Sequence, residues 1–193
     1  MKRASRNLLL FVAVVIAMCI GIGIVLASKR TPVKRFHVVY EGRVYRSGFP
    51  TAAGLAALME KRPVKTVVSL SGDTTDEYKE FYAFTASSGV HHVSLPMGAS
   101  RPPSREEAVA FLDALADSNN WPVLVHCGAG VERTGWMIAL HRVVTEGWTW
   151  EHALKEACRY GLNDGKERQT VDAVAALARE LSATNAPAWR NER

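Results

Sequence analysis

Cysteine is scarce in this sequence, and acidic residues are missing from its first part. Only Cys19, Cys127 and Cys158 occur among 193 residues, and their spacing fits neither a disulfide framework nor a zinc site. Residues 2–35 contain seven Lys or Arg and no Asp or Glu, whereas the chain from Phe36 onward has 17 basic and 19 acidic residues. The second part is therefore almost neutral, which argues against a nucleic-acid-binding surface there.

Residues 8–27 carry no charge at all. A helix of this length spans about 30 Å, the thickness of the hydrocarbon core of a bilayer, and basic residues flank it on both sides. The run therefore predicts a single membrane-spanning anchor. The alternative is a signal peptide cleaved after Val25-Leu26-Ala27, but the run is longer than the usual signal-peptide core of roughly 7–15 residues. Basic residues on both sides leave the orientation across the membrane open.

Strand and helix patterns alternate through the rest of the chain. The β-branched run at 66–70 predicts a buried strand, a second strand is expected at 90–95 and a short apolar strand at 123–126, and a further short strand is expected around Val44-Tyr45. Helices are expected at 51–61, 76–88, 134–146, 149–160 and 171–181, and another behind a capping box of Ser104 and Glu107. This alternation predicts an α/β domain with a central, mainly parallel sheet flanked by helices. The predicted division of the chain is a basic N-terminus (1–7), the anchor (8–27), a linker (28–37), the folded domain (38–182) and a C-terminal tail (183–193).

One loop combines the features of an anion-binding site. Residues 126–135 read His-Cys-Gly-Ala-Gly-Val-Glu-Arg-Thr-Gly, between a predicted strand and a predicted helix. A short loop at a helix N-terminus points several backbone N–H groups at one spot, where the helix dipole adds positive potential. Glycines let such a backbone turn tightly and approach the anion. The segment therefore predicts a phosphate cradle formed by Gly128, Ala129, Gly130, Val131, Arg133 and Thr134.

The side chains of this loop suit phosphoryl transfer. The N–H groups that hold a phosphate would also stabilise a thiolate, so Cys127 is the candidate nucleophile. The planar guanidinium of Arg133 can bind two phosphoryl oxygens at once, which the point charge of a lysine cannot. Thr134 is expected to hydrogen-bond the sulfur, and His126 to orient the loop. A buried, inert cysteine is the alternative, but it does not account for the ordered set of neighbours. The segment is not a Walker loop, because it has no Gly-Lys followed by Ser or Thr.

The segment resembles the signature of the protein tyrosine and dual-specificity phosphatases, which is His-Cys, five residues, then Arg-Thr-Gly. Tyr45-Arg46-Ser47-Gly48 and Leu95-Pro96-Met97 are similar to flanking motifs of bacterial members that carry an N-terminal membrane segment, and the likeness covers residues 36–182. The resemblance implies the cysteine-dependent phosphatase fold and a phosphocysteine intermediate. It also implies phosphorylated protein or small phosphoester substrates, no metal or other cofactor, and a single-pass location in a bacterial inner membrane.

The general acid that this resemblance implies is missing from its usual place. Relatives protonate the leaving group with an Asp on a loop beside the site, but residues 96–102 contain no carboxylate. Three residues are candidates for this role: Glu132, inside the signature loop, Asp73, which follows the strand at 66–70, and Asp76. Asp76 is interpreted as a helix-start residue, where an acid suits the dipole.

Other polar residues have plainer interpretations. Arg46 is expected to be a structural ion-pair partner. Arg101 is expected at the edge of the pocket, within reach of a substrate phosphate. His91 and His92 are expected on a strand face, because neither has a metal-ligating partner at a suitable spacing.

Several functions fit the sequence. The favoured one is hydrolysis of phosphotyrosine or mixed phosphoprotein substrates, because the loop has no Lys and carries Glu132, which disfavours a highly anionic inositol phosphate. A phosphoinositide or small-molecule phosphatase is the alternative. A weakly catalytic, phosphate-binding adaptor would account for the missing Asp. A redox sensor or sulfur-transfer protein would use the same reactive thiol.

Overall fold

The computed structural model describes residues 15–16, 18, 33–72, 75–98 and 101–184. The chain divides into two units, residues 1–32 and 33–193. The predicted anchor at 8–27 lies outside the described residues except for Val15, Ile16 and Met18. Within the part that is described, no helix is long and apolar enough to cross a membrane.

The second unit contains a five-stranded sheet in the order β1-β2-β5-β3-β4. The strands are β1 (His37–Tyr40), β2 (Val44–Ser47), β3 (Thr66–Ser69), β4 (His91–Ser94) and β5 (Val123–His126). β1 pairs with β2 antiparallel, and all other pairs are parallel. The predicted mainly parallel sheet is therefore confirmed, with one antiparallel strand added at its edge.

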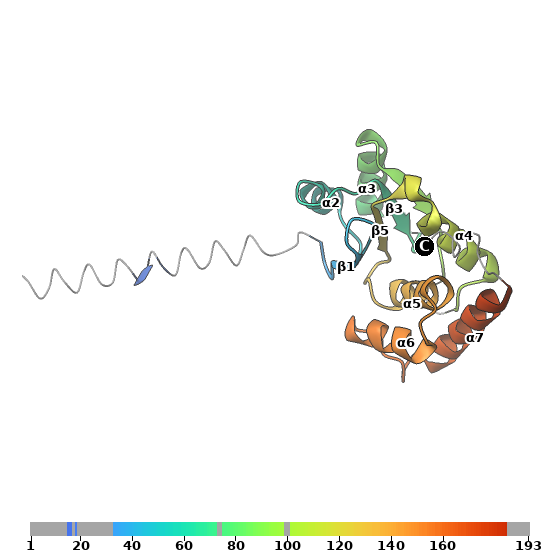
Figure 1. Cartoon of the computed structure of the whole chain (residues 1–193). Coiled ribbons are helices and arrows are strands. Elements are labelled where there is room, and N and C mark those ends of the chain that lie inside the picture. The colour runs from blue at the N-terminus through green and yellow to red at the C-terminus, as the bar shows by residue number, and fades with distance from the viewer. Residues whose placement is uncertain (1–14, 17, 19–32, 73–74, 99–100, 185–193) are drawn as a thin grey trace, which may run out of the picture. The chain divides into compact units, whose positions relative to one another are not determined.

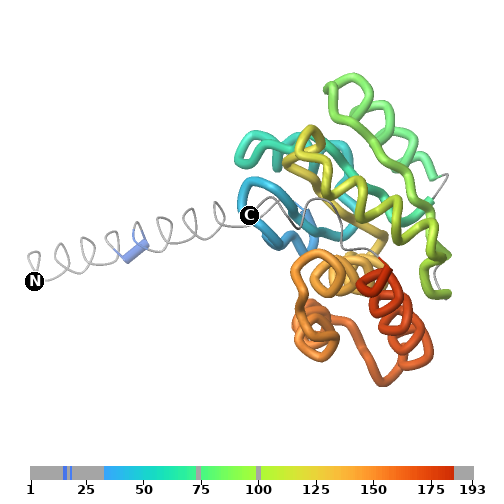
Figure 2. Tube along the Cα trace, turned by 45° about the vertical axis from the view of Figure 1, so that its right-hand side comes forward, coloured from blue at the N-terminus to red at the C-terminus, as the bar shows by residue number. Residues whose placement is uncertain are grey.

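Helices cover both faces of the sheet (Figures 1 and 2). On one face lie α2 (Ala52–Met59) and α3 (Asp76–Ser87). On the other lie α4 (Arg105–Ala116), α5 (Glu132–Glu146), α6 (Trp150–Arg159) and α7 (Arg168–Thr184), and a short 3₁₀ helix, Ser118–Asn120, follows α4. Because side chains alternate along a strand, Leu124 of β5 packs against the first layer, while Val123 and Val125 pack against the second.

The helix boundaries follow the local signals of the sequence. Ser104 and Glu107 form the predicted capping box at the start of α4. Thr51 and Thr149 cap α2 and α6 with their hydroxyl groups, and Gly147 ends α5 in the left-handed conformation. α5 begins at Glu132, two residues before the predicted start, because the signature loop leads directly into its first turn.

One strand of the sheet, β1, was not predicted from the sequence. Residues 33–37 were assigned to a linker, but β1 begins at His37 and the compact unit begins at Val33, which is only 3% exposed. Val33 joins the apolar cluster of α2, α3 and Tyr45. The segment just before β1 is therefore part of the folded domain.

The register of the sheet places three strand ends side by side. Ser47 of β2 and Ser69 of β3 both pair with His126 of β5. The carboxyl ends of parallel strands meet at one edge of a sheet, where α/β proteins usually place their sites. The predicted phosphate cradle begins at this edge.

Candidate active site

The loop after β5 is wound around the sulfur of Cys127. The side chain of Cys127 is 1% exposed, and its Sγ accepts a hydrogen bond of 3.2 Å from the backbone N–H of Gly130. Gly130 has φ = 74°, and a Cβ at this position would lie 2.4 Å from the backbone nitrogen of Gly48. Only glycine fits here, both in conformation and in space.

The carbonyl groups of the same loop point outward and are each held by a donor. The N–H of Phe49 donates to the Gly128 carbonyl over 3.0 Å. The carbonyl oxygens of Ala129 and Gly130 accept hydrogen bonds of 3.0 Å from Arg35 Nη1 and Arg46 Nη2 respectively. A loop whose carbonyls face outward turns its N–H groups inward, as an anion cradle requires.

Arg46 was predicted to form a structural ion pair, but it binds a backbone carbonyl of the phosphate loop instead. Its side chain is 1% exposed, bonds the phosphate loop, and lies 4.6 Å from the ring of Tyr160. Its Nε and Nη1 have no hydrogen-bond partner among the described residues. Burial lowers the pKa of Arg46 from its usual value. The guanidinium thus places a buried positive charge behind the loop.

Arg133 lies in the first turn of α5, and its side chain reaches the segments that follow β3 and β4. Its Nη1 approaches the carbonyl oxygens of Met97 and Leu70, at 3.3 and 3.5 Å. A Cβ added at Gly128 would lie 3.9 Å from Nη2. The guanidinium is therefore held above the loop by the segments that follow β3 and β4.

His126 belongs to a chain of hydrogen bonds beneath the loop. Its Nε2 lies 2.7 Å from Ser69 Oγ, which in turn lies 2.8 Å from Nε2 of His92. Burial, together with the nearby His92 and Arg133, lowers the pKa of His126 to about 3. His126 is therefore a neutral imidazole at physiological pH, and the chain fixes its orientation. His92 lies on a strand, as predicted, and contacts the ring of Tyr82.

Thr134 does not make the predicted hydrogen bond to the sulfur of Cys127. Its hydroxyl is fully buried, and no hydrogen-bond partner for it occurs among the described residues, the sulfur of Cys127 included. A buried hydroxyl without a partner is costly to keep. Thr134 therefore retains an unused donor directly behind the loop.

The three candidate acids have unequal structural support. Glu132 is half-buried in the first turn of α5, next to Arg133, and no partner for its carboxylate is found within the described part of the chain. Asp73 lies outside the described residues. Asp76 begins α3, as predicted, and pairs with Lys79 at 2.8 Å. The structure thus brings Glu132, but not Asp76, to the phosphate loop.

Arg101 does not face the loop as a free cation. Its two terminal nitrogens bind both carboxylate oxygens of Glu107, at 2.8 and 2.6 Å. Glu107 also closes the capping box of α4. Arg101 therefore secures the start of α4.

Among the described residues, no group of three or more His, Cys, Asp or Glu is arranged to hold a metal ion.

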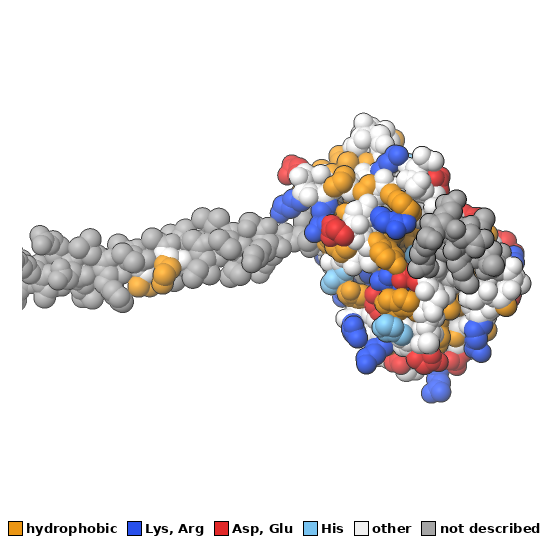
Figure 3. Space-filling view, viewed as in Figure 1, with side chains coloured by type: hydrophobic (Ala, Val, Ile, Leu, Met, Phe, Trp, Pro, Cys, Tyr) orange, Lys and Arg blue, Asp and Glu red, His pale blue; other side chains and the backbone are white. Residues whose placement is uncertain are grey.

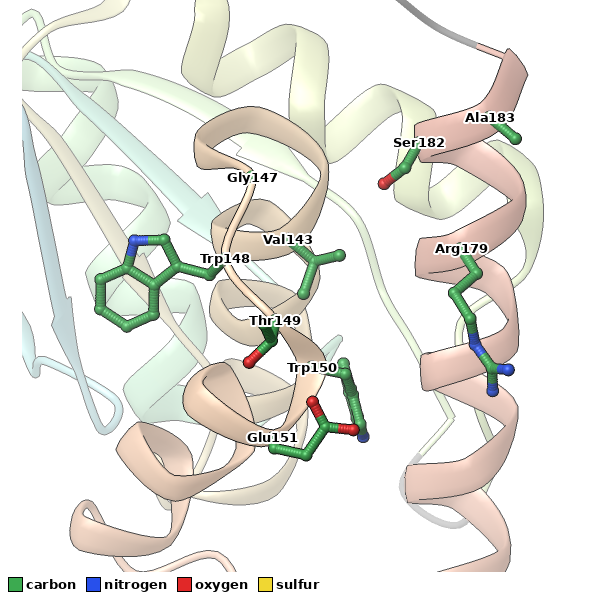
Figure 4. Close-up of a pocket in the computed structure, with 9 residues that line it drawn as sticks. All are labelled: Val143, Gly147, Trp148, Thr149, Trp150, Glu151, Arg179, Ser182 and Ala183. Atoms are coloured by element: carbon green, nitrogen blue, oxygen red, sulfur yellow. The ribbon is translucent and has the colours of Figure 1, made fainter.

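A hollow of about 700 Å³ lies between the α5–α6 turn and α7, where Trp150 and Glu151 face Arg179 (Figure 4). It adjoins Gly147, at the opposite end of α5 from Glu132. A 15-residue helix is about 22 Å long. The hollow is therefore separate from the loop of Cys127.

Sequence reasoning missed two residues of the site, Arg35 and Ser69. Arg35 was counted among the basic residues of a linker, and nothing in its spacing indicates a bond to residue 129. Ser69 ends the predicted strand at 66–70, and a polar residue at the end of a buried parallel strand is a usable signal for a site.

Residues 29–175 match the family model PTP-NADK, described as a DSP-PTPase phosphatase fused to NAD+ kinase. The chain is 35% identical over 130 residues to the dual specificity protein phosphatase TpbA of Pseudomonas aeruginosa strain UCBPP-PA14, a match that covers 67% of this chain and 56% of TpbA. It is 27% identical over 129 residues to the inositol diphosphatase SIW14 of Saccharomyces cerevisiae, covering 64% of this chain and 44% of SIW14. The chain thus spans about half the length of these curated relatives.

The folded domain is also similar to solved structures. The crystal structure of P. aeruginosa TpbA matches with a TM-score of 0.62 at 29% identity, covering 77% of this chain and 91% of that one. The catalytic core of SIW14 from S. cerevisiae matches with a TM-score of 0.63 at 23% identity, covering 80% of this chain and 94% of that one. At 23% identity, the match to SIW14 shows only that the two folds are alike.

Proposed function

Because this chain belongs to the DSP-PTPase family of phosphatases, we propose that it hydrolyses phosphomonoesters through a phosphocysteine intermediate on Cys127. One observation carries the proposal. The sulfur of Cys127 accepts the N–H of Gly130, while the guanidinium of Arg133 lies over the same loop. A nucleophile, an anion cradle and a bidentate cation thus converge on one position.

In the first step the Cys127 thiolate attacks the phosphorus of the bound phosphate. The S–P bond forms, the ester P–O bond breaks, and the leaving oxygen takes a proton from a general acid, for which Glu132 is the proposed donor. The N–H groups of the loop and the fork of Arg133 bind the equatorial oxygens, where negative charge is spread in the transition state.

In the second step a water molecule attacks the phosphorus of the phosphocysteine and gives a proton to the Glu132 carboxylate, which restores the acid for the next turnover. The S–P bond breaks, the sulfur leaves as a thiolate, and inorganic phosphate is released. His126, neutral and held by Ser69, keeps the loop in place without adding charge.

Phosphotyrosine or mixed phosphoprotein is the proposed substrate class. TpbA is named a dual specificity protein phosphatase, and a TpbA variant that is 28% identical to this chain has been solved with pTyr, with a TM-score of 0.59. The signature loop of the present chain, residues 126–135, has Arg133 as its single cationic side chain and has no Lys. A compact, singly phosphorylated group suits that charge balance better than a crowded polyphosphate.

Inositol phosphates are the rival substrate class, because two relatives are named inositol diphosphatases, SIW14 of S. cerevisiae and DSP3 of Arabidopsis thaliana. A weakly catalytic, phosphate-binding adaptor is the rival of a different kind. The two rivals differ in turnover: the first hydrolyses inositol phosphates faster than phosphopeptides, and the second hydrolyses neither.

A substrate panel on the full-length chain tests the proposal. We expect phosphotyrosine peptides to be hydrolysed faster than inositol phosphates. We also expect Cys127→Ser to abolish turnover while it still binds vanadate, and Arg133→Lys to lose at least about a hundredfold in kcat/KM. Wild-type turnover no faster than that of Cys127→Ser would indicate the adaptor. Substantial activity of Cys127→Ser would rule out the covalent mechanism.

A further inference from the structure

The hydrogen bond from Arg35 to the Ala129 carbonyl acts on the same peptide group that contacts the sulfur. The carbonyl of residue 129 and the N–H of residue 130 belong to one planar peptide unit, in which they point in opposite directions. Arg35 Nη1 holds the oxygen end at 3.0 Å, and the N–H end donates to Cys127 Sγ at 3.2 Å. We propose that Arg35 is a positioning residue that aims the Gly130 N–H at Cys127.

The other two donors to the loop act on different peptide units. Phe49 holds the Gly128 carbonyl, whose unit ends in the N–H of Ala129. Arg46 holds the Gly130 carbonyl, whose unit ends in the N–H of Val131. Of the three anchored units, Arg35 holds the one whose N–H reaches the sulfur. A cation at the carbonyl also polarises the peptide group, which strengthens its N–H as a donor to a thiolate.

The segment that carries Arg35 is fixed against the loop from behind. Val33 is buried in the core, and the Lys34 carbonyl accepts a hydrogen bond of 2.8 Å from the N–H of Gly48. Gly48 in turn packs against the loop, since a Cβ there would lie 3.1 Å from the Ala129 carbonyl oxygen. The turn at Gly48 therefore lies between the phosphate loop and residues 33–35.

The backbone of Arg35 adopts the left-handed conformation. Its φ of +50° is the one positive value for a non-glycine residue within the described residues. This conformation is unfavourable for a residue with a side chain. Such strain persists where the surroundings enforce it, and it is common at functional sites. Glycine would relieve the strain, but it would lack the guanidinium that reaches Ala129.

The inference rests on the proposed function for its effect on turnover, but its first readout needs no substrate. Alkylation of Cys127 by iodoacetamide follows the thiolate, and mass spectrometry of the Cys127 peptide measures its rate from pH 5 to pH 9 in the full-length chain. The peptide of Cys158, a half-buried thiol in α6, serves as the internal reference. Turnover of an aryl phosphate is the second readout.

Arg35→Gln removes the guanidinium, and Lys34→Gln is the matched control, because it makes the same charge change one residue away on an exposed side chain. We expect Arg35→Gln to move the midpoint of the Cys127 alkylation profile upward by about 0.5–1 pH unit and to lower kcat/KM by about tenfold, the size of one charge-assisted hydrogen bond. Lys34→Gln should leave both unchanged. Arg35→Lys should recover part of the effect, because it restores a cationic donor.

Arg35→Gly separates positioning from folding. It removes both the donor and the strain, so it should shift the alkylation profile as Arg35→Gln does without lowering the melting temperature. A variant that is merely misfolded would instead show a lowered melting temperature. The proposal is overturned if the profiles of Arg35→Gln and Lys34→Gln coincide. A shifted profile in a chain that hydrolyses no phosphomonoester would sustain the positioning role and overturn the proposed function instead.

Discussion

The position of Glu132 at the start of α5 fits two roles, that of a helix-start residue and that of the general acid. It begins α5, where an acid is favoured by the helix dipole alone. If it is also the general acid, Glu132→Gln should harm substrates with poor leaving groups far more than those with good ones, by up to about 10²–10⁴-fold. The measurement is kcat/KM across aryl phosphates of graded leaving-group acidity, where the variant's line should be steeper than that of the wild type.

Two controls accompany this series. Asp76→Asn changes a carboxylate that begins α3 and pairs with Lys79, so its line should coincide with that of the wild type. Asp73→Asn is expected to give a smaller loss, equal for all leaving groups. A Glu132→Gln line parallel to that of the wild type would exclude Glu132, and a steeper Asp73→Asn line would transfer the role to Asp73.

At this scale the sequence identifies the residues that are close together along the chain. Cys127, Gly130 and Arg133 lie within seven positions, so their order in the sequence is enough to predict an anion-binding loop. Arg35 and Ser69 act across long separations, through a carbonyl and an imidazole that pairing of β2, β3 and β5 brings near. No local pattern marks such contacts, which is why the sequence predicted the loop but not its supports.

Among the elements, α5 links the site to the far end of the sheet. Its His141 is 5% exposed and contacts Tyr40 of β1 and Thr145. Burial, together with the positive charges of Arg142 and Arg43, lowers the pKa of His141 to about 3. Glu146 lies 3.8 Å away, but its carboxylate is already bound by Arg142 at 2.9 Å.

A neutral buried histidine makes stability depend on pH. The unfolded chain binds a proton on this imidazole below about pH 6.5, whereas the native state does so only near pH 3. The free energy of unfolding should therefore fall as the pH is lowered from about 7 to 3, by about 4 kcal/mol from His141 alone. His126, whose pKa is also lowered to about 3, adds a second contribution of the same sign.

Urea unfolding at several pH values checks this expectation. His141→Gln should flatten the dependence on pH between 7 and 3, leaving the part due to His126. His91→Gln is the matched control, because that imidazole is exposed in the folded domain and its removal should leave the slope as in the wild type. An unchanged slope in His141→Gln would show that the imidazole is already protonated in the native state.

Elements with strong local signals were predicted well. β3 and β5 are β-branched runs buried on both faces, and α4 starts at a capping box visible in the sequence. β1 was missed because it is an edge strand of four half-buried residues whose register is broken between Val38 and Tyr40. Its pairing with β2, rather than any periodicity of its own, makes it a strand.

For the whole molecule, charge is distributed unevenly along the chain. On the visible face of the domain, acidic and basic side chains are interspersed (Figure 3). The excess of basic residues falls instead within residues 2–35. The predicted membrane anchor, residues 8–27, lies between the basic residues of that segment and outside the described residues except for three of them.

The anchor is therefore a prediction of the sequence, and cell fractionation tests it. Twenty uncharged residues should keep the full-length chain in the membrane fraction after washing with high salt and carbonate. The free energy gained by burying their apolar side chains in the bilayer exceeds the cost of placing a helical backbone there. Deleting residues 1–28 should release a folded, active domain, because the compact unit begins only at Val33. A Leu8–Ala27 run interrupted by two arginines is the matched control, since a charge at the centre of a span costs about 2.5–3.5 kcal/mol. A mature chain beginning at Ser28 would identify a cleaved signal peptide instead, and a full-length chain washed off by salt would show surface attachment through the basic residues alone.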